Sequence, residues 1–386
     1  MNFEFSDEQK MLRDQAQRFL RENCTSALVR EVMESEQGYD RALWTQLSEM
    51  GWHGIAIPEE FGGLGGGYLE LCILAEQLGR FLAPVPFAAT QYLATRALLL
   101  TGSEQQKAAW LPEVAAGERI GCLALAERPG SLLQRQTECF VAGGRLHGSK
   151  TPVMDGAVAD FALISARSSV AADAPVALYL VDLCQPGVQR SALPVIDGSR
   201  PHARLGFEGI VVEPLHEGGD YARQVAAILD GAATLLAFEQ VGGADATLEM
   251  ACAFALERKA FGRPIGGFQA VKHKLADMYV KNELARANAY YAAWALASGD
   301  AELALAAPAA RIAATDAFEY ATQENIQIHG GMGYTWEVDA HLFYRRSRSL
   351  AQVIGSAREW KERLTSRLVA RLHQTAKKPV KAEVAD

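Results

Sequence analysis

One segment of the sequence combines a basic side chain with a sharp turn between two predicted helices. It runs Glu257-Arg258-Lys259-Ala260-Phe261-Gly262-Arg263-Pro264-Ile265-Gly266-Gly267-Phe268-Gln269. The helical pattern ends near Lys259 and resumes around Phe268, so Arg258 stands on a rigid element beside the turn. A guanidinium in that position can bind two oxygens of a pyrophosphate group at once. The alternative is a surface salt bridge, which composition alone favours.

A second segment places glycines directly after a long predicted helix. It reads Gln327-Ile328-His329-Gly330-Gly331-Met332-Gly333-Tyr334. Glycine lets a ligand approach the backbone closely, although the same pattern also suits a helix C-cap followed by a turn. Neither this segment nor the glycine-rich run at 62–67 is a dinucleotide fingerprint, because no strand precedes it and no βαβ unit surrounds it.

A carboxylate lies within an apolar stretch of a predicted helix. Glu239 is expected on the same helical face as Ala232, Leu236 and Gly243. Burial raises the pKa of a carboxyl group, which is what a general base working at neutral pH requires. The alternative is a structural acid paired with an arginine or a backbone group, since ion pairs also shift pKa values.

The elements that position these residues follow a distinctive order. Helical patterns cover much of residues 1–118, where Ser6 and Gln9 form a predicted capping box, and they return at about 222–258, 264–298, 302–329 and 338–372. Between them, short apolar runs alternate with turn residues. The sequence therefore predicts a mainly α, α+β protein with an N-terminal helical domain at 1–118, a middle antiparallel β domain at 119–221 and a C-terminal four-helix bundle at 222–386.

Composition narrows the classes of function. The 386 residues carry a formal net charge of −8, which argues against general nucleic-acid binding. The six cysteines are scattered without CxxC or Cys/His spacing, so no metal site is expected and the thiols are expected to be reduced, as in a cytoplasmic protein. The acidic N-terminus lacks the apolar core of a signal peptide, and no apolar run approaches the ~18 residues of a membrane span.

Together these segments resemble the acyl-CoA dehydrogenase family over nearly the whole chain. The resemblance includes Phe5-Ser6-Asp7-Glu8-Gln9, Ile57-Pro58-Glu59-Glu60-Phe61-Gly62-Gly63, Gly102-Ser103-Glu104-Gln105-Gln106-Lys107 and Gly148-Ser149-Lys150, besides the two segments above. Each motif is weak alone, but their order and spacing are specific.

The resemblance implies FAD as cofactor and an acyl-CoA thioester as substrate. Arg258, Phe261 and Gln269 would hold the diphosphate and adenosine side of FAD, while Gln327, Gly330 and Gly331 would hold its adenine end in a neighbouring subunit; Ser356 is also expected at the cofactor. The family forms homo- or heterotetramers. A carboxylate removes the α-proton, the β-hydride passes to flavin N5, and an electron-transferring flavoprotein accepts the electrons.

The sequence departs from the family at the base and at the flavin ring. Ile354 stands where the family carries its late catalytic Glu, and Ala232 stands where some relatives carry the base instead. Relatives also have Trp-Ile-Thr-Asn-Gly against the flavin ring, where this chain has Pro152-Val153-Met154-Asp155-Gly156. An equivalent change affects the segment Ala126–Leu132, whose last two residues lie outside the residues that the structure describes.

Three hypotheses follow. The chain is an acyl-CoA dehydrogenase with a displaced base, for which Glu239 is the candidate. Alternatively, it is a companion subunit that helps a paralogous subunit bind FAD without doing chemistry itself, as in family members that act on steroid side chains or dicarboxylic acyl groups. The third hypothesis is a flavoprotein lyase or oxidase on the same scaffold. Fold resemblance alone does not choose among them.

Overall fold

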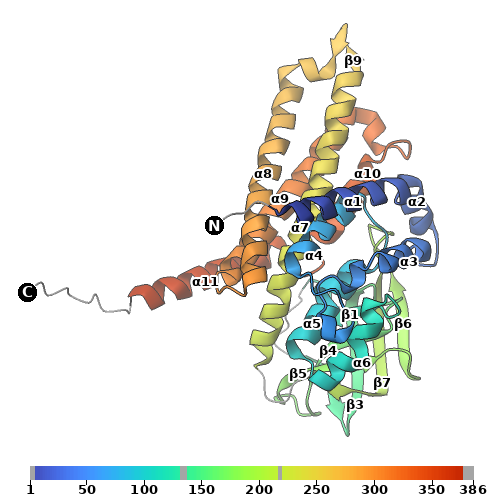
Figure 1. Ribbon diagram of the computed structural model, residues 1–386, viewed down its shortest axis with the longest axis vertical. Helices are drawn as coiled ribbons and strands as arrows, with labels where there is room; N and C mark the ends of the chain where they lie inside the picture. The colour runs from blue at the N-terminus through green and yellow to red at the C-terminus, as the bar shows by residue number, and fades with distance from the viewer. Residues whose placement is uncertain (1–4, 131–136, 216–219, 377–386) are drawn as a thin grey trace, which may run out of the picture.

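The computed structural model describes residues 5–130, 137–215 and 220–376. In the described part of the chain helices lie toward both ends and strands occupy the middle, as Figure 1 shows. This arrangement confirms the predicted fold class. Four of the six cysteines are buried, Cys184 is exposed, and none forms a disulfide.

The N-terminal part is a packed set of helices whose ends follow local sequence signals. The predicted capping box at the first helix is present, with Gln9 N–H donating to Ser6 Oγ and the Gln9 amide oxygen accepting from Ser6 N–H. After α4 the chain forms a π-helical segment at Ala88–Thr95, followed directly by a short α-helix at Arg96–Thr101. The elements are α1(Asp7–Asn23), α2(Ser26–Glu34), α3(Arg41–Glu49), η1(Trp52–Gly54), η2(Glu59–Phe61), α4(Tyr68–Arg80), η3(Ala88–Thr95), α5(Arg96–Thr101) and α6(Glu104–Ala115).

The middle part is a sheet with the order β6-β7-β3-β2-β4-β5-β8, and β1 pairs with β4. Most pairs are antiparallel, as predicted, but β1 and β2 each pair with β4 in parallel, so the sheet is mixed. This detail differs because strand direction depends on which distant strands pair. The strands are β1(Gly121–Ala124), β2(Phe140–Ala142), β3(Arg145–Met154), β4(Phe161–Arg167), β5(Val176–Asp182), β6(Val188–Leu193), β7(His202–Val211) and β8(Glu213–Pro214).

The C-terminal part contains long antiparallel helices. The predicted helix over 338–372 is wrong as a single element, because the chain breaks between Leu350 and Ala357, where Gly355 has a φ of +100°. Pro308 lies inside the helix Leu303–His329. The elements are α7(Tyr221–Glu257), β9(Lys259–Ala260), β10(Arg263–Pro264), η4(Ile265–Gly267), α8(Gln269–Ser298), α9(Leu303–His329), η5(Gly330–Tyr334), α10(Ala340–Leu350) and α11(Ala357–Ala376).

Glycines let α7 pack closely against its neighbours. A methyl group on Gly242 would overlap the carbonyl oxygen of Glu76 on α4, and one on Gly243 would lie 2.5 Å from the ring of Phe318 on α9. The pair Gly242-Gly243 is therefore required by helix packing on two sides. This contact sets the depth at which Glu239, three residues earlier, enters the core.

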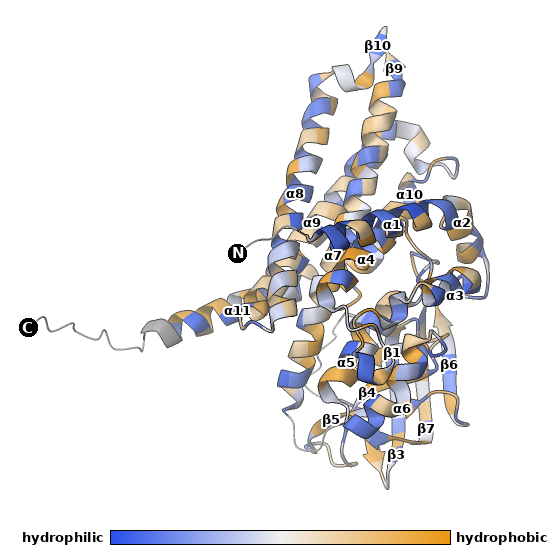
Figure 2. Cartoon of the chain, in the orientation of Figure 1, coloured by the Kyte–Doolittle hydropathy of each residue, from blue (hydrophilic) through white to orange (hydrophobic). Residues whose placement is uncertain are grey.

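Burial follows hydropathy. Hydrophilic residues predominate along the outer helix α1, which buries only Ala16 and Leu20, as Figure 2 shows. Among the described residues, α7 alone has the length and apolar composition to cross a membrane, and 89% of that apolar window is buried inside the protein. Such burial is typical of the central helix of a packed core.

Candidate functional site

The segment around Arg258 forms a small hairpin at the end of the long α7–α8 pair, at the top of Figure 1. Phe261 adopts a φ of +53° at its turn and is 95% exposed. Behind it, the Arg263 guanidinium lies 4.1 Å from the centre of the Phe268 ring. The hairpin therefore presents an aromatic tip that its own chain leaves uncovered.

Arg258 caps the C-terminal end of α7 and is exposed. No ion pair joins it to any other residue within the described ranges, so the surface salt bridge that composition favoured is not formed there. Gln269 begins α8 and is also exposed. Three candidate cofactor residues, Arg258, Phe261 and Gln269, thus lie exposed at the same end of the α7–α8 pair.

The end of α9 lies beside this hairpin's supporting helix. The His329 ring stacks on Phe254 of α7 with ring centres 4.1 Å apart, and its Nδ1 lies 2.9 Å from the carbonyl oxygen of Asn325. Gly331 has no positive φ, and a methyl group on it would meet no atom within 4 Å. Neither backbone conformation nor packing within the chain requires glycine there, whereas a closely approaching ligand or second chain would.

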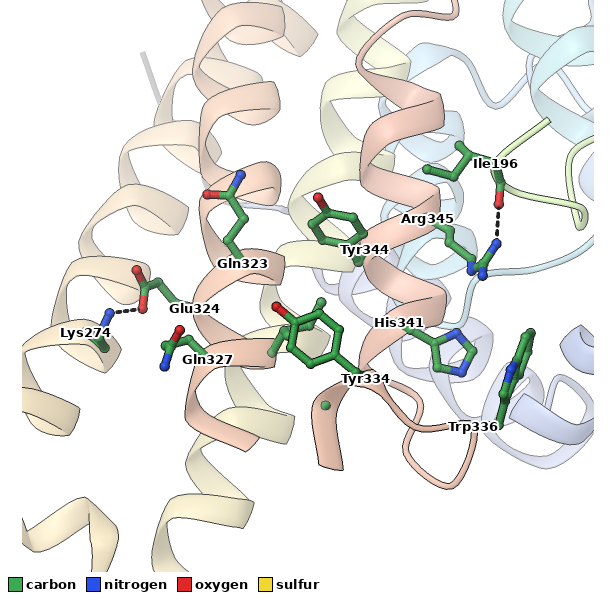
Figure 3. A pocket seen from close by; sticks show the side chains of 12 residues that line it. Ile196, Lys274, Gln323, Glu324, Gln327, Tyr334, Trp336, His341, Tyr344 and Arg345 are labelled. Atoms are coloured by element: carbon green, nitrogen blue, oxygen red, sulfur yellow. Dashed lines mark hydrogen bonds and ion pairs between the residues drawn. The ribbon is translucent and has the colours of Figure 1, made fainter. Parts of the chain in front are cut away.

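Gln327 lines a polar cavity of about 590 Å³ between α8, α9 and α10. Gln323 and Gln327 of α9 line this cavity together with Tyr334 and Tyr344, and all four are labelled in Figure 3. The cavity is closed at one side by the ion pair between Lys274 and Glu324. At the other side, Arg345 donates to the carbonyl oxygen of Ile196 and the His341 ring lies against Trp336. Amides, phenols and aromatic rings suit a nucleotide better than an aliphatic ligand.

Ile354 lies in the wall of a second cavity of about 450 Å³, here called the Ile354 cavity. Side chains from all three parts of the chain form it: Leu93, Leu123, Leu125, Pro129, Pro152, Met154, Leu193, Pro194, Val195, Ile196, His202, Leu229, Arg348, Ser349, Gln352, Val353 and Ile354. None of these described lining residues is a carboxylate. Pro152 and Met154, which belong to the segment that the resemblance places against the flavin ring, are apolar parts of the same wall.

Glu239 lies elsewhere, in a buried network of charges. Its Oε1 accepts from Arg200 Nη2 at 2.6 Å and lies 3.5 Å from Arg346 Nη1, and all three residues are at most 2% exposed. Arg346 Nε also donates to Asp197 at 2.5 Å. Glu239 is not among the residues of the Ile354 cavity, so the geometry favours a structural acid over a displaced base.

Asp155 completes this buried network. It is 1% exposed, and its Oδ2 has no hydrogen-bond partner in the described part of the chain. Burial raises its pKa from an ordinary 3.8 to about 7, although Arg200 and Arg346 lower it; Glu239 and Asp197 raise it further. Of the three acids Glu239, Asp197 and Asp155, Asp155 is the one that forms no ion pair with an arginine in the described part of the chain.

Two further residues shape the chain near Ile354. Ser356 N–H donates to Glu359 Oε2 at 2.7 Å and Ser356 Oγ lies 2.9 Å from the same oxygen, so Ser356 already caps α11. Arg311, buried and missed by the sequence analysis, donates to Gln240 Oε1 at 2.5 Å and to the carbonyl oxygen of Leu350. Arg311 thus fixes the end of α10, from which the Ile354 segment departs. Its only sequence signal was a charge within an alanine-rich helix.

Comparison with known proteins agrees with this architecture. The family model "Acyl-CoA dehydrogenase, N-terminal domain" matches residues 6–118, and "Acyl-CoA dehydrogenase, C-terminal domain" matches residues 222–364. Acyl-CoA dehydrogenase IpdE2 of Mycobacterium tuberculosis is 35% identical over 93% of this chain and 97% of its own length.

Solved structures give the same result. The steroid ACAD Tcur3481-Tcur3483, in a variant form, is 29% identical with a TM-score of 0.85, covering 95% of this chain and 99% of that one. The ChsE4-ChsE5 complex from Mycobacterium tuberculosis is 28% identical with a TM-score of 0.83, covering 98% and 100%. The chain belongs to the acyl-CoA dehydrogenase family, as a dehydrogenase or a subunit of one, and is an oxidoreductase of the type that acts on CH–CH groups of acyl-CoA thioesters.

Proposed function

We propose that this chain is the companion subunit of a heteromeric acyl-CoA dehydrogenase. The observation that carries the proposal is a division within the molecule. No described residue of the Ile354 cavity is a carboxylate. In contrast, Arg258, Phe261 and Gln269 are exposed, where a neighbouring subunit can contact them. This combination of a cavity without a base and exposed cofactor residues is expected of a subunit whose partner binds the flavin ring and supplies the base.

The chemistry of the reaction supports the same proposal. Removal of an α-proton from an acyl-CoA needs a proton acceptor within hydrogen-bond reach. The aliphatic side chain of Ile354 cannot accept a proton, and Glu239 is already engaged by Arg200 and Arg346. The hypothesis of a displaced base therefore loses its candidate residue, and the partner becomes the source of the base.

FAD fits the exposed residues of this chain. In the proposed assembly, Arg258 binds the diphosphate, Phe261 and Gln269 contact the adenosine side, and Gln327, Gly330 and Gly331 contact the adenine end, with Ser356 nearby. The open space around Gly331 supports this assignment. When bound, FAD would supply the acceptor for the β-hydride. The groups of this chain would hold and orient it.

The partners of the proposed complex follow from the same reasoning. We infer a heterotetramer with a paralogous, Glu-bearing subunit, located in the cytoplasm, that passes electrons to an electron-transferring flavoprotein. The ChsE4-ChsE5 complex gives a solved precedent for two different family chains in one assembly. The steroid ACAD suggests a bulky, ring-bearing acyl-CoA as substrate.

The decisive experiment compares the purified chain alone with the chain co-expressed with a Glu-bearing homologue. Alone, it is expected to retain little flavin and to show weak or no dehydrogenase activity with ring-bearing and simple acyl-CoA substrates. With its partner, it should form a heteromer with one FAD per pair of chains and measurable turnover. A homotetramer with one FAD per chain and ordinary turnover of a simple acyl-CoA would overturn the proposal.

Arg258→Ala is expected to weaken FAD retention in that complex. Loss of a charge-assisted contact costs roughly 1.5–3 kcal/mol, or about a tenfold to hundredfold weaker affinity. Flavin content after gel filtration at decreasing protein concentration measures the effect. Arg18→Ala, at an exposed position of α1, is the matched control. Equal flavin retention in both variants would remove Arg258 from the cofactor site.

A further inference from the structure

The Ile354 cavity remains unexplained by the companion role. Its walls are mainly aliphatic, and the Arg348 guanidinium at its edge is occupied by an ion pair with Glu319 at 2.6 Å. Ser349 and Gln352 add two neutral polar groups beside Arg348. His202 is the one ionisable side chain of the described cavity wall that takes part in no ion pair.

His202 presents a defined face to this cavity. Its Nδ1 lies 3.1 Å from the backbone carbonyl oxygen of Arg200. A carbonyl oxygen only accepts hydrogen bonds, so Nδ1 carries the proton. Nε2 of the neutral ring is then an acceptor, and no described residue donates to it. His202 begins β7 directly opposite Met154 of β3, which also lines the cavity.

The surroundings keep the imidazole neutral. Burial is the largest effect on the pKa of His202 and lowers it, and the charge of Arg200 lowers it further. The contact with the Arg200 carbonyl and the charge of Asp197 raise the pKa, but the net result is a pKa below the ordinary value. At neutral pH His202 therefore adds an unprotonated ring nitrogen, a hydrogen-bond acceptor, to a mainly aliphatic wall that also contains the neutral side chains of Ser349 and Gln352. An anionic group such as a carboxylate or phosphate placed against His202 would meet an unprotonated nitrogen that cannot donate to it.

We propose that the Ile354 cavity binds a compact apolar molecule that carries a hydroxyl group, and that this hydroxyl donates its hydrogen to Nε2 of His202. The proposal rests on the companion role, because a flavin ring held by this chain would occupy the same space. A hydroxyl is favoured over a ketone or an ether, since only the hydroxyl satisfies the nitrogen lone pair. His202 thereby becomes the residue that sets ligand specificity in this subunit.

Three naphthalenes of equal ring size test the proposal by calorimetric titration of the co-expressed complex at neutral pH. We expect 2-naphthol to bind about tenfold more tightly than 2-methoxynaphthalene, the factor that corresponds to about 1.4 kcal/mol and to one net hydrogen bond. We expect 2-naphthoate to bind more weakly than either. FAD per pair of chains is measured on the same sample.

Variants assign the binding to this cavity. His202→Phe keeps a ring but removes the acceptor, and should abolish the preference for 2-naphthol over 2-methoxynaphthalene. His202→Gln keeps an acceptor and should retain part of the preference, which also guards against a folding defect in the Phe variant. Ile354→Trp, or the milder Leu123→Phe, should fill the cavity and remove binding of both neutral probes. His273→Phe on the exposed face of α8 is the control.

The outcomes separate this inference from the proposed function. One FAD per pair, with a hydroxyl preference that His202→Phe removes, supports both. One FAD per pair, with no binding or with a preference that survives His202→Phe, overturns the inference and leaves the companion role standing. Two FAD per pair overturn the companion role itself, since this chain would then hold its own flavin.

Discussion

Replacing Glu239 with alanine is expected to lower the free energy of unfolding by about 3–5 kcal/mol, the usual cost of removing one partner of a buried ion pair. Arg200 would lose its only carboxylate contact within hydrogen-bond distance in the described part of the chain, at 2.6 Å. Its Nε and Nη1 already have no partner there, so no second acceptor is at hand. Arg346 would keep Asp197, which places the damage mainly at Arg200.

Urea unfolding followed by circular dichroism measures this loss. Glu362→Ala is the control, because the Arg358–Glu362 pair is exposed and such pairs contribute about 0–1 kcal/mol. Glu239→Gln, which keeps an acceptor oxygen, should fall between the two. A Glu239→Ala protein that unfolds at the wild-type urea concentration would contradict the structural role. Unchanged stability together with turnover lowered at least about 100-fold would restore Glu239 as a general base.

Asp155→Asn is expected to stabilise the protein at pH 8 and to leave stability unchanged near pH 4. The pKa of Asp155 is about 7 in the folded chain against an ordinary 3.8, chiefly because burial disfavours the charged carboxylate. The stability that this group contributes is therefore complete below pH 3.8 and is lost as the pH rises to about 7. The full difference between these pKa values corresponds to roughly 4 kcal/mol.

Asparagine suits this position because it tolerates the positive φ of +54°. The quantity to measure is the difference in unfolding free energy between Asp155→Asn and wild type at pH 5, 6, 7 and 8, so that other titrating groups cancel. It should grow with pH. Asp173→Asn, at an exposed position, should give a difference that stays flat. A flat difference for Asp155→Asn as well would show that Asp155 is charged throughout this range.

Structural features formed by residues close together in the sequence could be predicted from the sequence. The capping box of Ser6 and Gln9 and the turn predicted after Arg258 are both present, the turn as part of the short β9–β10 hairpin. They are formed by residues within a few positions of each other, and their dihedral preferences and hydrogen bonds are local. Family motifs then extended these local patterns to the fold class and to acyl-CoA dehydrogenase chemistry.

Contacts between distant residues decided the rest. Glu239 could be interpreted as a base or as a structural acid until Arg200 and Arg346, 39 and 107 positions away, were placed beside it. The pattern of apolar and polar residues continues through the break between α10 and α11 and does not predict it. Tertiary contacts hold the chain there: Arg311 on α9 donates to the Leu350 carbonyl oxygen, and Trp360 Nε1 donates to the Ile354 carbonyl oxygen.

The sequence by itself determined the family, the order of helices and strands, and the loss of a carboxylate at position 354, because each is written in residue types and short spacings. Only the tertiary structure decided that Ile354 shares a cavity with His202, that Asp155 joins a buried charge network, and that Arg258 is free of an ion pair within the described chain. Burial, which sets the protonation of Asp155 and His202, exists only once the three parts of the chain pack together.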